Sequence, residues 1–142
     1  MKLYSKYHGV QDYSEGDVIT FEKGIPGFKD LKKFILFPLE GNNVFSMLHS
    51  LENAEIGLVV VSPFYVMKDY EFKLEDKETK ELKIKNEEDV AILCTVCVNN
   101  NVKKITANLK APIVINIKEH LGEQLILDND KYLIKQPLLK EE

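Results

Sequence analysis

The chain has 142 residues, a length typical of one domain, and 44% of them are hydrophobic and 30% charged, which argues against a disordered chain. Its formal net charge is −4, and every basic residue is a lysine. Because arginine supplies the bidentate contacts to phosphate and guanine, an acidic chain without arginine is a poor candidate for direct nucleic-acid binding.

The N-terminus carries no pattern of a secreted or membrane protein. Residues 1–10 (MKLYSKYHGV) lack the continuous apolar run of a secretory signal. The longest apolar stretch, residues 57–67, is interrupted by Ser62 and Pro63 and is shorter than the ~20 residues that a membrane-spanning helix needs. We therefore expect a soluble, cytoplasmic protein that does not contact a membrane.

Alternation of apolar and polar residues is the main structural signal. Residues 17–23 (DVITFEK) place Ile19 and Phe21 on one face, and residues 70–75 (YEFKLE) alternate without interruption. Two later segments predict shared faces for two groups of residues: Ile105, Ala107 and Leu109, then Ile113, Ile115 and Ile117. Such alternation predicts half-buried β-strands.

Four other segments are more uniformly apolar and predict strands buried on both faces. They are residues 32–39, 44–51, 57–63 and 90–98. The asparagines at 99–101 predict a hairpin connection after the last of these strands, and residues 128–130 (DND) predict a further turn.

Helical patterns are scarce. Residues 76–90 allow one or two short helical turns, and residues 120–124 (HLGEQ) allow another. Eight or more short, regularly spaced strands predict an all-β fold, an antiparallel barrel or sandwich. We expect a single domain over residues 1–142, with its core at about 17–138 and a loose C-terminal tail in the segment LLKEE.

The segment FEKGIPGFKD, residues 21–30, raises the question of why apolar side chains lie on a turn. Pro26 and Gly27 suit the two central positions of a type II turn, with Ile25 and Phe28 at its corners. Both side chains could close the end of the core. Alternatively, they could form a preorganised apolar contact for a partner.

The sequence lacks a recognisable catalytic or metal-binding constellation. Cys94 and Cys97 have the spacing of a redox or zinc motif, but on a strand two residues three apart point to opposite faces. We expect two reduced cysteines. The three histidines have no ligand spacing, and the glycines of the 21–30 segment are not followed by a phosphate-loop lysine. We expect no enzyme, no metal and no cofactor.

Four segments of the chain resemble segments of one protein family and occur in the same order as in that family. They are ITFEKGIPGFKDLKKFILFPL, FSMLHSLENAEIGLVVVSP, NLKAPIVINI and LGEQLILDNDKYLIKQPL, and together they span Val18 to Leu138. The chain resembles the FliW family of flagellar assembly factors. It departs from the family pattern at His49, where the family usually has glutamine, and at Ala107, where Thr-Val is common.

The resemblance implies a barrel-like all-β domain and a regulatory role. Proteins of this family bind flagellin in the cytoplasm and also bind the RNA-binding translational regulator CsrA, which they keep off the flagellin message. When flagellin is exported, the freed factor sequesters CsrA and translation resumes, which is a partner switch. An acidic chain suits a basic partner of this kind. We expect a monomer in isolation.

Candidate contact residues come from three segments. By alternation, Leu48 and Leu109 are expected in the core, whereas Met47, His49, Asn108 and Lys110 are expected on the surface. The full candidate set is Ile25, Pro26, Gly27, Phe28, Met47, His49, Ser50, Asn108, Lys110 and Pro112. Pro112 is also explained by the start of an edge strand, and Asn108 by a hydrogen bond to its own turn.

Two other classes of function remain open. A small β-barrel that binds a ligand in its mouth needs polar groups converging on an apolar cavity. An RNA-binding barrel needs a basic strand face studded with aromatic residues. The aromatic residues at 45, 64, 65, 70 and 72 are instead interleaved with aliphatic and acidic residues, which is typical of core.

Overall fold

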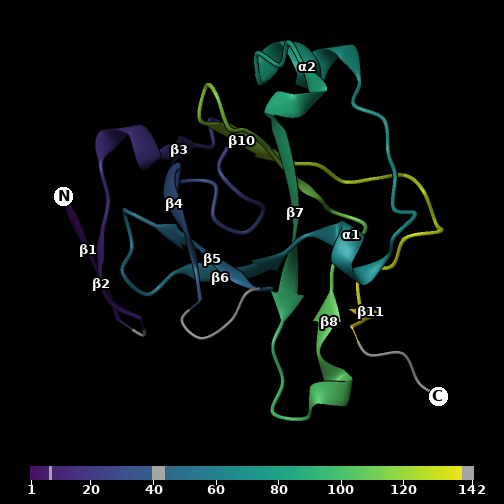
Figure 1. Cartoon of the computed structure of the whole chain (residues 1–142), viewed down its shortest axis with the longest axis horizontal. Coiled ribbons are helices and arrows are strands. Elements are labelled where there is room, and N and C mark those ends of the chain that lie inside the picture. The colour runs from purple at the N-terminus through teal and green to yellow at the C-terminus, as the bar shows by residue number, and fades with distance from the viewer. Residues whose placement is uncertain (7, 40–43, 139–142) are drawn as a thin grey trace.

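Seven strands close into a barrel in the computed structural model, which describes residues 1–6, 8–39 and 44–138 (Figure 1). The order around the barrel is β7, β6, β5, β4, β3, β10 and β9, and β9 pairs again with β7. All these pairings are antiparallel except that of β3 with β10. The bounds are β3 Ile19–Thr20, β4 Lys33–Pro38, β5 Ser46–Ser50, β6 Gly57–Val61, β7 Val90–Cys97, β9 Ile113–Asn116 and β10 Leu121–Gln124. The predicted all-β, barrel-like fold is confirmed.

The long strand β7 connects the barrel to a small extension. Its residues 90–93 pair with β9, and Cys94 and Thr95 pair with β6. Its last two residues pair with β8 (Thr106–Ala107), which in turn pairs with β11 (Gln136–Pro137). In Figure 1, β8 and β11 therefore extend from the C-terminal end of β7.

A hairpin that the sequence pattern did not predict covers one side of the barrel. It consists of β1 (Lys2–Ser5) and β2 (Gly9–Asp12). Ser5 Oγ lies 2.9 Å from His49 Nε2, and His49 Nδ1 lies 2.8 Å from the carbonyl oxygen of Ser50. Nδ1 therefore donates to Ser50, and Nε2 accepts from the Ser5 hydroxyl, which fastens the hairpin to β5.

The helices are all short. They are α1 (Pro63–Val66), α2 (Asp76–Glu81) and the 3-10 helices η1 (Glu15–Asp17), η2 (Glu87–Asp89) and η3 (Val102–Lys104). The helical turns expected within residues 76–90 are confirmed, whereas α1 was not predicted. Among the described residues, the structure contains no helix with the length and apolar character needed to span a membrane.

Helix α2 is held to the barrel by an ion-pair cluster. Lys23 Nζ lies 2.7 Å from Glu81 Oε2 of α2 and 2.8 Å from Glu123 Oε1 of β10. The hydrogen bond from Lys23 holds the pKa of Glu81 below its usual value. Since the Lys23 side chain is 56% exposed and that of Glu81 is 33% exposed, solvent screening limits what this cluster adds to stability.

Two groups of apolar side chains form the core. One fills the barrel around Phe21, Phe34, Leu48 and Ile115. The other lies beneath β6, β7 and β8 and contains Tyr70 and Tyr132, whose ring centroids are 4.5 Å apart. Tyr70 Oη donates to the carbonyl of Leu109 at 2.8 Å, and burial raises the pKa of this phenol. Leu48 and Leu109 are fully buried, as predicted.

Alternation predicted burial better than it predicted strand pairing. The expected strand at residues 70–75 is wrong: Tyr70 is buried and Phe72 is half-buried, but within the described residues this segment forms no strand. Its alternating apolar side chains, Tyr70 and Phe72, pack in the second core group. The backbone amide of Glu71 donates to Tyr132 Oη rather than to a neighbouring strand. The exposed Phe64 and Tyr65 on α1 also contradict their expected core placement.

Three further expectations are wrong. Within residues 120–124, which were expected to form a helical turn, Leu121–Gln124 form β10. Ile117 is exposed, because β9 ends at Asn116, whose Oδ1 accepts from the amides of Lys118 and Glu119 and turns the chain. The four uniformly apolar segments do contain strands, but Leu36 of β4 is 40% exposed and is not buried on both faces. The C-terminal tail at 139–142 lies outside the described residues.

The hairpin connection after β7 and the turn at 128–130 are confirmed. β7 and β8 pair antiparallel across the connection that contains Asn101, whose Oδ1 accepts from Lys103 N. Asn129 Oδ1 accepts from Lys131 N in the second turn. Asparagine side chains therefore stabilise both turns, as their composition predicted.

We predict that Gly122→Ala destabilises the barrel. A Cβ at this position in β10 would lie 2.5 Å from Phe21 Cζ, inside the packed core. Overpacking of this kind costs about 1–3 kcal/mol of unfolding free energy. Urea denaturation of Gly122→Ala beside Gly16→Ala, whose Cβ would meet Ser14 Oγ at an ordinary 3.8 Å, measures the difference. Equal midpoints for the two variants would contradict the packing argument.

Candidate protein-binding groove

The turn at residues 24–29 is the two-residue connection that its sequence predicts. Phe28 N donates to the carbonyl of Ile25 at 2.7 Å, and Ile25 N lies 3.4 Å from the carbonyl of Phe28. Gly27 has φ +90°, which suits the third position of a type II turn. Gly24 has φ +68°, and a Cβ there would overlap the backbone of Lys29. The glycines are thus required by the backbone.

The two apolar corners of this turn have different environments. Ile25 is only 3% exposed and belongs to the barrel core, whereas Phe28 is 38% exposed. Each of the two interpretations of this turn, closure of the core and an exposed apolar contact, therefore fits the placement of one of its residues. Ile25 closes the core, and Phe28, beside the exposed Pro26, is left at the surface.

The segment from Asn108 to Pro112 separates β8 from β9 along the same edge of β7. Asn108 N donates to the carbonyl of Thr95 at 2.9 Å, and Asn108 Oδ1 accepts from the amides of Lys110 and Ala111, each at 3.1 Å. The side chain of Asn108 thus forms its own turn, as one of its two interpretations predicted. Lys110, in the same turn, is half-buried.

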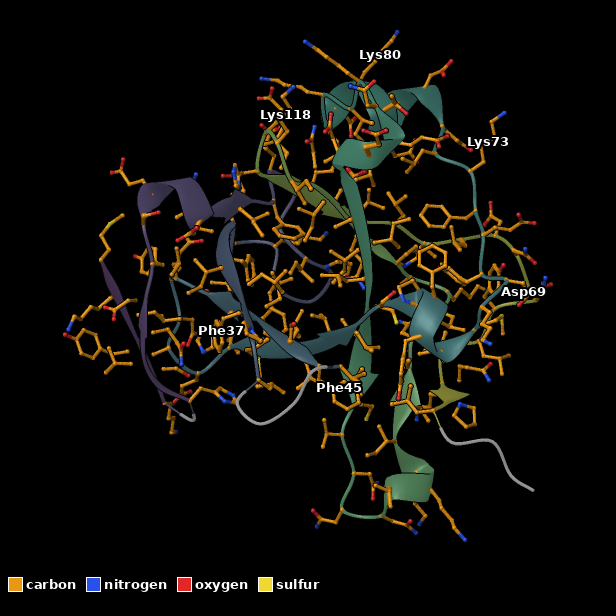
Figure 2. The ribbon with its side chains drawn as sticks, in the orientation of Figure 1. Phe37, Phe45, Asp69, Lys73, Lys80 and Lys118 are labelled. Atoms are coloured by element: carbon orange, nitrogen blue, oxygen red, sulfur yellow. The ribbon has the colours of Figure 1, made fainter. Side chains whose placement is uncertain are left out.

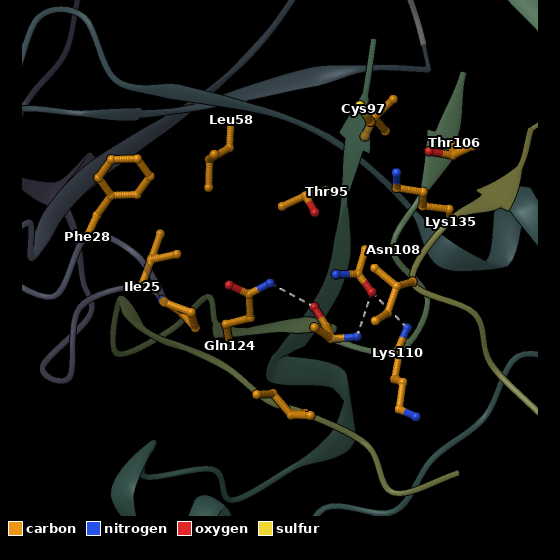
Figure 3. Close-up of a pocket in the computed structure, with 15 residues that line it drawn as sticks. Ile25, Phe28, Leu58, Thr95, Cys97, Thr106, Asn108, Lys110, Gln124 and Lys135 are labelled. Carbon is orange, nitrogen blue, oxygen red and sulfur yellow. Dashed lines mark hydrogen bonds between the residues drawn. The ribbon is translucent and has the colours of Figure 1, made fainter. Parts of the chain in front are cut away.

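These two segments face each other across an open groove of about 630 Å³. Five of the ten candidate residues line it: Ile25, Pro26, Phe28, Asn108 and Lys110. Figure 3 shows Ile25 and Phe28 on one side of Thr95, with Thr106 and Lys135 on the other side. The sequence therefore identified two walls of one groove from segments about eighty residues apart.

The other walls were missed by the sequence analysis. Thr95 and Cys97 of β7, together with Ile126 and Ile134, are among the further lining residues. Ile126 is 72% exposed and Ile134 is 63% exposed. The amides of Leu125 and Leu127 donate to the carbonyls of Pro112 and Lys110, which leaves the intervening Ile126 at the surface. Side chains alternate between two faces at residues 125–127, and this alternation was the sequence signal that could have predicted the exposure of Ile126.

The surface placement expected for Met47 and His49 is wrong. Met47 is 3% exposed, His49 is 1% exposed, and Ser50 is fully buried. Alternation correctly placed Met47 and His49 opposite Leu48, but the β1–β2 hairpin packs on this second face through the Ser5–His49 hydrogen bond. Any role of these three residues in binding stays a prediction.

Gly27 and Pro112 do not line the groove. Gly27 lies at the exposed tip of its turn, whereas Pro112 is buried immediately before β9. Because β9 pairs with both β7 and β10, the edge-strand explanation for Pro112 is wrong. Proline is tolerated here because it stands at the start of the strand, and its carbonyl still accepts from Leu125 N at 2.8 Å.

The chemistry of the groove is that of a contact surface. Of its polar groups, Gln124 Nε2 donates to the carbonyl of Ala111 at 3.0 Å, and Asn108 Oδ1 is taken up by its own turn. Among the described residues, no group of three or more histidine, cysteine or acidic side chains is placed to hold a metal ion. Exposed apolar side chains on a rigid scaffold are suited to binding another protein.

The two cysteines lie on opposite faces of β7, as predicted. Cys94 is buried, and burial raises the pKa of its thiol to about 12. Cys97 is exposed at the groove. The motif therefore does not bring the two sulfur atoms together.

Comparison with known proteins identifies the family. The FliW protein family model matches residues 2–138. The chain belongs to the FliW family. It is 56% identical over 142 residues to the flagellar assembly factor FliW of Clostridium botulinum (strain Okra / Type B1), covering 100% of this chain and 99% of that protein. It is 59% identical over 141 residues to that of Clostridium novyi (strain NT), covering 99% of each chain.

A solved FliW structure has the same fold. The crystal structure of a flagellar assembly factor FliW superposes with a TM-score of 0.93 at 40% sequence identity, over 100% of this chain and 99% of that chain. The barrel described above is therefore the FliW fold, and the groove lies on a scaffold shared with that protein.

We predict that Ile25→Ala lowers the free energy of unfolding much more than Phe28→Ala does. Ile25→Ala leaves a cavity in the barrel core and should cost about 2–5 kcal/mol of unfolding free energy. Phe28→Ala removes a partly exposed ring and should cost about 1 kcal/mol. Thermal and urea unfolding of both variants measure the contrast, and an equal loss in the two would show that Phe28 is a core residue.

We also predict that Cys97, but not Cys94, reacts with a thiol reagent in the native protein. A chromogenic reagent that forms a mixed disulfide should modify the Cys97 thiol quickly in the folded protein. The Cys94 thiol should react only after unfolding. Mass spectrometry of the labelled peptides identifies the site. Rapid labelling of Cys94 in the native state would contradict the burial of that side chain.

Proposed function

We propose that this chain is a flagellar assembly factor that acts by binding proteins, with flagellin and the RNA-binding regulator CsrA as its two partners. Flagellin binding would release CsrA, and loss of flagellin by export would allow the chain to sequester CsrA again. This partner switch would operate in the cytoplasm and relieve repression of flagellin synthesis. Membership of the FliW family supports the assembly role, and the exposed apolar groove supports action through binding.

The groove is the single observation on which the binding proposal depends. Phe28, Ile126 and Ile134 expose apolar surface to solvent around it. The backbone of Phe28 is held by a turn in which Pro26 restricts φ and Phe28 N donates to the carbonyl of Ile25, so this backbone loses little conformational entropy when a partner covers it. Completing the burial of such side chains favours association through the hydrophobic effect.

The charge of the chain supports CsrA as one partner. Its formal net charge is −4, with no arginine. An acidic protein attracts a basic RNA-binding protein over several ångströms and has little affinity for RNA itself. The same charge supports antagonism of an RNA-binding protein without direct RNA binding.

Isothermal titration calorimetry tests the proposal. We expect the purified chain to bind cognate flagellin and CsrA separately, and each partner to weaken binding of the other. Phe28→Ala should weaken binding of at least one partner by about tenfold or more, since central aromatic contacts cost ~2 kcal/mol or more when truncated. Tyr4→Ala, which removes an exposed ring on the β1–β2 hairpin outside the groove, is the matched control.

Binding of neither protein would refute the proposed partners. Binding of both without mutual weakening would refute the switch while leaving the partners in place. A gel shift with flagellin leader RNA provides the third measurement, and binding of the RNA by this chain alone at physiological salt would favour the RNA-binding alternative.

A further inference from the structure

The groove has a local charge opposite to that of the whole chain. Its lining includes Lys110 and Lys135, and among the described residues it includes no aspartate or glutamate. Within the described ranges, the carboxylate that pairs with Lys110 is that of Asp130, at 3.5 Å, whose side chain is fully exposed. An exposed pair of this length contributes little, so the positive charge of Lys110 remains available.

A second cavity continues the groove around the Pro26 turn. It has a volume of about 380 Å³ and shares Pro26, Gln124 and Ile126 with the groove. Its charged lining consists of three lysines against two glutamates: Lys23, Lys29, Lys77, Glu78 and Glu123. The two cavities together form one surface with an apolar centre and lysines at both ends. At the end formed by the second cavity, Glu123 pairs with Lys23, and Glu78 lines the same cavity as Lys29 and Lys77.

Lys29 and Lys135 mark the two ends of this surface. Both side chains belong to exposed residues, and neither forms an ion pair within the part of the chain that the structure describes. Lys23, in contrast, is already neutralised by Glu81 and Glu123. Lys29 and Lys135, like Lys77 in the second cavity, are therefore cations that a bound partner can pair with at no cost to an existing ion pair.

We propose that this surface binds an amphipathic segment whose apolar side chains are flanked on both sides by carboxylates. The apolar side chains contact Phe28, Ile126 and Ile134, and the carboxylates pair with Lys29 at one end and Lys135 at the other. The proposal rests on the proposed function, because it specifies which kind of partner enters the groove.

The same charges disfavour a basic segment. Lysines at both ends of a partly desolvated groove repel a cationic peptide over roughly one Debye length, about 8 Å at physiological ionic strength. A basic regulator such as an RNA-binding protein would therefore dock on a different, acidic surface. Under this proposal the two partners of the switch bind different surfaces.

Fluorescence anisotropy with labelled peptides tests the assignment directly. The probes are helical peptides of about 14 residues, long enough to be marginally helical in water, with leucines at i, i+3, i+4 and i+7. One carries glutamates at its flanking positions, and the other carries lysines at the same positions. We expect the glutamate peptide to bind about tenfold more tightly, with the difference shrinking as salt is added.

Charge-reversal variants locate the effect. The double variant Lys29→Glu/Lys135→Glu should invert the preference between the two peptides. Lys118→Glu is the matched control, since Lys118 follows β9 at the end of β7 opposite Cys97 and lines neither cavity. Figure 2 shows Lys118 at the same end of the molecule as Lys80 of α2, away from β8 and β11. This control should keep the preference of the unaltered chain.

Each outcome decides the proposal. A preference for the glutamate peptide that the double variant inverts would support it. Equal binding of the two peptides, a preference for the lysine peptide, or no binding of either at about 1 mM would overturn it. These results do not depend on flagellin or CsrA, so failure here is distinct from failure of the calorimetric titrations with those proteins.

Discussion

The pairing of β7 with β9 is the constraint on which the rest of this structure depends. Residues 90–93 of β7 pair with residues 113–116 of β9, and this contact joins the two ends of the sheet into a barrel. Closure removes the unpaired strand edges that would otherwise invite aggregation. β7 is longer than β9, so its last residues extend beyond the closed part and pair with β8 instead.

The groove is a consequence of this excess length. Because β8 and β9 follow the same edge of β7 in turn, the chain between them must leave the sheet and return to it. Asn108 makes that departure possible by capping its own turn, and Lys110 is carried outward with it. The C-terminal half of β7 then forms a floor, with Thr95 and Cys97 in the lining and the Pro26 turn opposite.

Sequence reasoning predicted local geometry well where a single residue type dictates it. Gly27 with positive φ and the opposite faces of Cys94 and Cys97 both follow from the backbone alone. It failed where a distant segment decides burial. His49 has the alternation of a surface residue, and its burial depends on Ser5, forty-four positions away in a hairpin that no pattern indicated. A pattern of period two reports which face a residue occupies and cannot report what covers that face.

The residues that pack the core and those that expose apolar surface at the groove are largely different. Phe28, Ile126 and Ile134 expose apolar surface at the groove but belong to neither core group, whereas the adjacent Ile25 and Leu127 do pack in the core. The core residues Ile25 and Leu127 thus fix the backbone of the segments from which Phe28 and Ile126 extend into solvent. A scaffold of this kind allows the surface side chains to change with the partner at small cost to the fold. An acidic chain can also have a positively charged groove, because net charge is a property of the whole surface, whereas recognition depends on the few charges that a partner approaches closely.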